Sequence, residues 1–159
     1  MGFGQAVSTC LGKYITFSGR ARRPEYWWFV LFTFVAGVVA TVLDVILGTG
    51  TFDGGMVQSL VSISLLLPTL GVTWRRMHDV GRPGYHALLP MAVMFVVAAV
   101  LVTALDGRRM GPGSLSSVAN PAFWVFALAT LGAFALVVKW LASPGQPGPN
   151  RFGPEPQPA

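Results

Sequence analysis

A short polar stretch, WRRMHDVGRPGY (74–85), gathers charge in a chain that has little elsewhere. It holds three arginines, a histidine and an aspartate, whereas only 11% of the 159 residues are charged. Guanidinium groups bind phosphate and carboxylate oxygens through paired N–H donors, and a neighbouring carboxylate can orient them. The stretch therefore predicts an anion-binding site, whose candidate residues are Arg75, Arg76, His78, Asp79 and Arg82.

A plainer interpretation of the same stretch makes it a topology signal. Arginines at the end of an apolar helix anchor that end in the headgroup region whether or not they bind a ligand. The histidine and the aspartate would then be solvated, and the glycines and the proline would form a turn. Both interpretations remain open at the level of sequence.

A second polar stretch, FSGRARRPEYWW (17–28), precedes the first apolar run. Arg20, Arg23 and Glu25 come from this stretch. We expect them on the same face of the protein as the first stretch, where they would extend the anion or partner site.

Other site chemistries have little support in the sequence. The second histidine, His86, is separated from His78 by a Gly/Pro turn, and neither glutamate nor cysteine lies nearby to complete a metal shell. Cys10 is the only cysteine, which excludes an intramolecular disulfide. We therefore expect no metal, no cofactor and no catalytic residues.

The composition indicates a membrane protein. Hydrophobic residues make up 53% of the chain and its mean hydropathy is +0.60. Such a chain covers its apolar surface with lipid. The net charge of +5 does not suggest nucleic acid as a partner, because the basic residues lie at the ends of apolar runs.

Four apolar runs predict an all-α membrane bundle of four helices. Each run is close to the ~20 residues that cross the hydrocarbon core. The predicted spans are 26–47, 56–74, 85–105 and 121–141, within a membrane domain of residues 1–142. With four spans, nine of the eleven Lys and Arg residues fall on the side of the termini, which predicts cytoplasmic N- and C-termini.

The two ends of the chain have patterns of their own. Apolar residues recur every three or four positions between Phe3 and Phe17, which predicts a short helix lying in the membrane interface. Residues 143–159 hold half of the twelve prolines, which predicts a disordered cytoplasmic tail.

Three stretches together resemble one family. FSGRARRPEYWWF, RRMHDVGRPGYHALL and GQPGPNRFGPEP, in this order, resemble the small bacterial inner-membrane proteins grouped as domain of unknown function 805. The resemblance implies a multi-span helical protein of the inner membrane and leaves its activity open. It also marks a tail motif of Asn150, Arg151, Phe152, Gly153 and Pro154.

We expect a binding or scaffold protein that recognises anionic lipid or a protein partner, including another copy of this chain. The first alternative is a subunit of a small-molecule transporter, which would have a water-filled cavity beside Ser59, Ser62 or Thr69. The second alternative is a membrane enzyme, which would bring His78, Asp79 and Glu25 together in one pocket.

Overall fold

The computed structural model describes residues 1–51, 54–104 and 121–156 of the chain. The protein is mostly helical and divides into two compact units. The first unit comprises Met1–Gly84 together with Ser143–Ala159, and the second comprises Tyr85–Ala142. The polar stretches of the sequence lie in the first unit, which therefore contains the candidate site.

Helix α1 (Phe3–Gly12) is amphipathic, as the sequence predicts. Its buried residues, Ala6 and Cys10, are four apart and lie on one face. Phe3 meets the ring of Trp28 edge to face, with the ring centroids 5.9 Å apart. The helix ends at Gly12, five residues earlier than predicted, and the N–H of Lys13 closes it on the carbonyl of Thr9.

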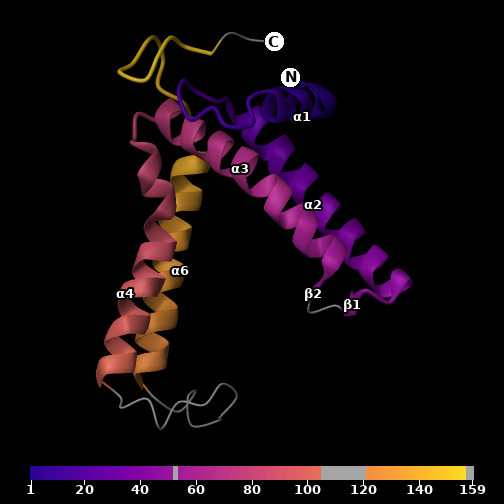
Figure 1. Cartoon of the computed structure of the whole chain (residues 1–159). Helices are drawn as coiled ribbons and strands as arrows, with labels where there is room; N and C mark the ends of the chain where they lie inside the picture. The colour runs from indigo at the N-terminus through magenta and orange to yellow at the C-terminus, as the bar shows by residue number, and fades with distance from the viewer. Residues whose placement is uncertain (52–53, 105–120, 157–159) are drawn as a thin grey trace. The chain divides into compact units, whose positions relative to one another are not determined.

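Helices α2 (Arg23–Leu47) and α3 (Met56–Asp79) form an antiparallel hairpin. Two short strands, β1 (Gly50–Thr51) and β2 (Gly54–Gly55), pair between them. Figure 1 shows α1 and the C-terminal tail at the end of the hairpin opposite to these strands. The N-terminal helix and the tail up to Pro156 therefore lie beside the same end of the hairpin (Figure 1).

A buried carboxylate closes the strand end of this hairpin. Asp44 accepts hydrogen bonds from the backbone N–H groups of Val57 and Gln58 at 2.9 and 2.7 Å, and from the hydroxyl of Thr49 at 2.6 Å. The first N–H groups of a helix have no partner within the helix, so a carboxylate at this position satisfies them. Asp44 thus caps α3 from α2, a role that its sequence position did not reveal.

Helix α3 is longer than the predicted span. It continues without a break through Pro68 and past Trp74, and it ends at Asp79. The residues RRMHD, predicted to lie in a connecting turn, instead form the last turn and a half of the helix and are buried. This extension brings two arginines, a histidine and an aspartate to the end of the hairpin where α1 and the tail lie.

The second unit contains a 3-10 helix that begins at the unit boundary (Gly84–Leu88) and helices α4 (Leu89–Ala104) and α6 (Pro121–Ala142). Helices α4 and α6 run side by side (Figure 1). Among the described residues, three helices are long and apolar enough to cross a membrane: α2, α3 and residues Trp124–Ala142 of α6. The apolar helix that begins at Gly84 is shorter, so the predicted span 85–105 stays a prediction.

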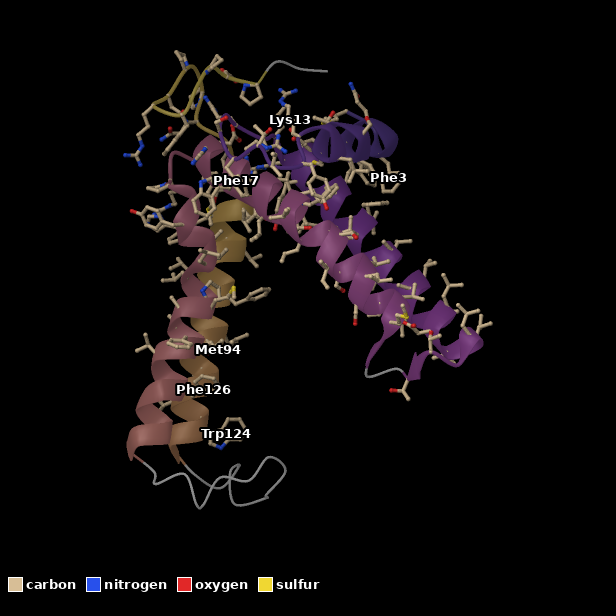
Figure 2. The ribbon with its side chains drawn as sticks, viewed as in Figure 1. Phe3, Lys13, Phe17, Met94, Trp124 and Phe126 are labelled. Atoms are coloured by element: carbon tan, nitrogen blue, oxygen red, sulfur yellow. The ribbon has the colours of Figure 1, made fainter. Side chains whose placement is uncertain are left out.

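Large apolar side chains remain exposed along α2 and α3. Phe34, Ile46 and Ile63 are each about 70% exposed. Lipid is the solvent that makes such exposure favourable over the length of two helices. Figure 2 shows mostly carbon in the side chains along α2 and α3, whereas most nitrogen and oxygen atoms gather near Lys13 and the tail.

Candidate functional site

Asp79, in the last turn of α3, lies between two guanidinium groups. Its Oδ1 accepts from Nε of Arg20 at 3.0 Å, and its Oδ2 pairs with Nη1 of Arg76. All three side chains are buried. Buried charges require partners, and one carboxylate here serves two cations.

A second buried ion pair joins α2 to α3. Nη1 of Arg75 lies 2.6 Å from Oε1 of Glu25, and Sγ of Cys10 is 3.8 Å from the same oxygen. Burial and, to a smaller extent, the nearby Glu25 carboxylate raise the pKa of the Cys10 thiol to about 12. The thiol is therefore protonated at neutral pH, which makes it a poor nucleophile.

Four arginines and two carboxylates form what we call the arginine cluster: Arg20, Arg23, Arg75, Arg76, Glu25 and Asp79. The segment Ser143–Pro156, which we call the tail strap, lies against it. Arg20 donates from Nη1 to the carbonyl of Gly148 at 2.6 Å and from Nη2 to the carbonyl of Gln146. Both Arg76 and Arg23 donate to the carbonyl of Ser143.

The close approach of the strap requires a glycine. A Cβ atom on Gly145 would lie 2.3 Å from Oδ2 of Asp79, and the N–H of the next residue, Gln146, donates to the carbonyl of Asp79 at 2.8 Å. A side chain at position 145 would push the strap away from the cluster.

The tail motif of the family is the part of the strap that contacts His78. The ring of Phe152 stacks on the imidazole of His78 at 4.0 Å, and Nδ2 of Asn150 donates to the carbonyl of His78 at 3.0 Å. Nδ1 of His78 lies 3.0 Å from the carbonyl of Gly19, which can only accept, so Nδ1 carries the hydrogen.

The prediction of a disordered tail is therefore wrong for residues 143–156. Proline and glycine exclude a regular helix from this segment. However, its carbonyl groups find fixed donors on the arginines, which hold the segment in an irregular but defined path. The amino-acid composition of a segment indicates whether it can form regular secondary structure. It does not indicate whether the segment is held by contacts with another part of the chain.

Two neighbouring hollows open beside the arginine cluster. Their volumes are about 330 and 470 Å³. Arg20, Arg22, Glu155 and Pro156 line both of them, Arg23 and Asp79 line the smaller, and Lys13 and Glu25 line the larger. We call these the basic hollows, because four of their lining side chains are cationic.

The predicted site residues thus separate into groups. Arg20, Arg76 and Asp79 meet in one network and Arg75 meets Glu25 in another, while Arg23 donates to the strap. Arg82 closes the turn after α3 through its backbone N–H, which donates to the carbonyl of Met77 at 2.9 Å.

The arrangement also bears on catalysis and on metal binding. His78, Asp79 and Glu25, the candidate catalytic set, have separate partners and do not form one pocket among the described residues. In that same part of the chain, no three His, Cys, Asp or Glu residues form a group that could hold a metal ion.

Sequence reasoning missed part of the site. The sequence interpretation treats Lys13 as a topology signal and leaves Arg22 out of the candidate site residues, yet both line a basic hollow. Gly145 and Glu155 were assigned to a disordered tail.

Comparison with known proteins places this architecture in a family. Residues 14–154 match the DUF805 family, described as a protein of unknown function. The chain belongs to the DUF805 family. The matched range includes both polar stretches and most of the tail strap, which are the parts that form the site.

Two relatives of this DUF805 chain are known from Escherichia coli K12. The inner membrane protein YhaH is 29% identical over 148 residues, which cover 92% of each chain. The inner membrane protein YhaI is 40% identical over 79 residues, which cover 50% of this chain and 64% of YhaI. No solved structure matches the chain. The DUF805 chain is thus a membrane protein with inner-membrane homologues.

Proposed function

We propose that this DUF805 protein is a binding protein of the bacterial inner membrane that recognises the anionic headgroup of a lipid at its basic hollows. The observation that carries the proposal is the lining of these hollows. Arg22 is half-buried and lines both hollows, and its guanidinium group makes no hydrogen bond among the described residues, whereas Lys13 is exposed and lines the larger hollow. Cationic side chains with open donors suit phosphate oxygens.

Two arginines of the cluster have a different role from the cations that line the hollows. Arg75 and Arg76 are at most 1% exposed and are paired with carboxylates. They hold α2, α3 and the strap together, so they form the frame of the site. Ligand contact falls to Arg22 and Lys13, together with Arg20 and Arg23, which also line the hollows.

A lipid headgroup is favoured over an acidic protein segment because of where the hollows lie. The smaller hollow is lined by Arg23 and Pro24 at the start of the apolar helix α2, and the exposed rings of Trp27 and Trp28 follow in the next turn of that helix. Tryptophan at helix ends is typical of the headgroup region, where phosphate groups are concentrated.

The test compares two single cation removals in detergent-solubilised, full-length protein. Short-chain phosphatidylglycerol and phosphatidylcholine are titrated separately, and bound lipid is counted by native mass spectrometry. Arg22→Gln should weaken phosphatidylglycerol binding by about fivefold, because one basic group near a headgroup contributes about 1 kcal/mol. The matched control, Lys139→Gln, removes an exposed cation that lines neither hollow and should leave binding within twofold.

Two results would contradict the lipid proposal. Equal retention of both lipids by the wild type would show that the headgroup charge is not recognised. Equal losses in Arg22→Gln and Lys139→Gln would show only general attraction to a basic surface. In the first case an acidic segment of a protein partner, or of a second copy of the chain, becomes the better occupant.

We also propose a topology of four spans in one bundle, with both termini in the cytoplasm. The proposal is supported by the excess of Lys and Arg on the side of the termini. A membrane-impermeant maleimide should label Ser8→Cys in a Cys10→Ala background only after the inner membrane is opened. Labelling in intact spheroplasts would place the N-terminus outside and would overturn the orientation.

A transporter subunit remains the second candidate because polar side chains line hollows between α2 and α3. Two hollows of about 440 and 270 Å³ share Thr33, Gly37 and Gln58, and the smaller one also contains Ser62 and Thr69. If water fills them, Ser62→Cys should react with a water-soluble thiol reagent in membranes. The control is Ile63→Cys, whose side chain is 69% exposed on an apolar surface, and it should not react.

A further inference from the structure

The tail strap presents oxygen atoms to the arginine cluster in the way that an anionic ligand would. Carbonyl oxygens of Ser143, Gln146 and Gly148 accept from the guanidinium groups of Arg20, Arg23 and Arg76. The Glu155 carboxylate lines both basic hollows. Donors that could grip a phosphate are thus occupied by the chain's own backbone.

The charges of the site favour a stronger acceptor than the strap. Five guanidinium groups, those of residues 20, 22, 23, 75 and 76, meet two carboxylates, Glu25 and Asp79, so three positive charges are in surplus. Glu155 supplies one compensating charge, and the carbonyl oxygens supply none. Hydrogen bonds from a guanidinium group to a charged oxygen are about twice as strong as those to a neutral one.

The strap is held by contacts that can be broken without unfolding the hairpin. Its prolines at positions 144, 149 and 154 are exposed, and its main aromatic contact is the stack of Phe152 on His78. Segments that bury little apolar surface open locally at low free energy. The helices α2 and α3 remain joined through the ion pair of Glu25 and Arg75, which involves no residue of the strap.

We infer that the tail strap is an internal competitor for the anion site: a lipid phosphate displaces Glu155 and the strap carbonyls, and the strap is released when the headgroup binds. This inference rests on the proposed function. It adds that binding and strap release are one event, so that an anionic membrane surface exposes the tail motif Asn150–Pro154.

Trypsin provides a direct readout of strap release. The bond after Arg151 lies within the strap, and a protease needs a locally opened segment to cut it. Full-length protein in detergent is incubated with trypsin and increasing short-chain phosphatidylglycerol, and loss of the C-terminal peptide is followed by mass spectrometry. Phosphatidylglycerol should accelerate this cut severalfold, whereas phosphatidylcholine should not change it.

Two variants loosen the strap without removing a cation. Gly145→Ala places a Cβ against Asp79, so it should speed the cut in the absence of lipid and tighten phosphatidylglycerol binding. Glu155→Gln keeps an acceptor for the N–H of Gly148 and removes the charge, so it should tighten binding by about fivefold. The control is Gly4→Ala, where an added Cβ meets nothing within 4 Å.

The outcomes separate the two proposals. If phosphatidylglycerol binds to the wild type while cleavage after Arg151 stays constant or slows, the headgroup site stands and the strap inference fails. If binding weakens in Gly145→Ala while its thermal unfolding matches that of Gly4→Ala, the strap is part of the site and does not compete. If neither the wild type nor the strap variants bind phosphatidylglycerol, the proposed function itself is wrong.

Discussion

Nη1 of Arg75 lies 2.6 Å from Oε1 of Glu25, fifty residues earlier in the chain, and both side chains are buried. The contact fixes the first turn of α2 against the last turns of α3. Together with the pairing of Asp79 with Arg20 and Arg76, it turns two polar stretches into one rigid platform. The ligand site and the strap both depend on this platform.

Removing one partner of the buried pair should destabilise the protein strongly. Glu25→Ala leaves the Arg75 guanidinium buried without its carboxylate, and such changes cost about 3–5 kcal/mol. The double variant Glu25→Ala/Arg75→Met should recover much of this loss, because it removes the unpaired charge as well. Thermal unfolding in detergent, followed by circular dichroism, provides the comparison. If the double variant is no more stable than Glu25→Ala, the unpaired charge of Arg75 is not the cause of the destabilisation.

Cys10 should be almost inert in the folded protein. With a pKa raised to about 12, its thiolate population at pH 8 is on the order of a thousandfold lower than that of an ordinary cysteine. Maleimide labelling should therefore be far slower than for Ser8→Cys in a Cys10→Ala background, where position 8 is exposed. Comparable rates at the two positions would mean that the thiol is neither buried nor protonated.

The same pKa shift has a consequence for stability. Folding raises the pKa of the Cys10 thiol above its ordinary value. The protonated thiol therefore makes its full contribution to the free energy of unfolding at any pH below that ordinary value. It is lost as the pH rises toward about 12. The midpoint of thermal unfolding should therefore fall as the pH becomes alkaline, and it should fall less in Cys10→Ala than in the wild type.

Asp44→Asn should loosen the strand end of the hairpin. The variant keeps one acceptor oxygen but loses the charge and the second acceptor that serve Val57, Gln58 and Thr49. Thr49→Val removes only one of these hydrogen bonds and should lower the unfolding midpoint less. Hydrogen exchange at the first N–H groups of α3 should be faster in Asp44→Asn, while exchange near Asp79 stays as in the wild type.

Gly84→Ala should disturb the turn after α3. An added Cβ would lie 2.1 Å from ring atoms of Trp74, and a rigid indole cannot give way as a flexible side chain can. Overpacking of this kind costs about 1–3 kcal/mol. Gly132→Ala in α6, where nothing lies within 4 Å, should cause no such loss in the same thermal unfolding assay.

The sequence by itself determined where the apolar helices run and which polar stretches matter. Apolar length and the proline and glutamate at the start of α2 predict that helix to within three residues, since these are local properties of the chain. The same reasoning identified Arg20, Glu25, Arg76 and Asp79 as site candidates. Charge is so costly in an apolar chain that its positions alone are informative.

Only the tertiary structure decided how these charges are used. Arg75 and Arg22 look alike in the sequence, yet one is buried against Glu25 and the other is open in the basic hollows. Asp44 could not be assigned as the cap of α3, and Gly145 could not be matched to Asp79, because each partner lies more than ten residues away. Pairing between distant residues depends on the packing of helices and on backbone approach, neither of which leaves a periodic pattern in the chain.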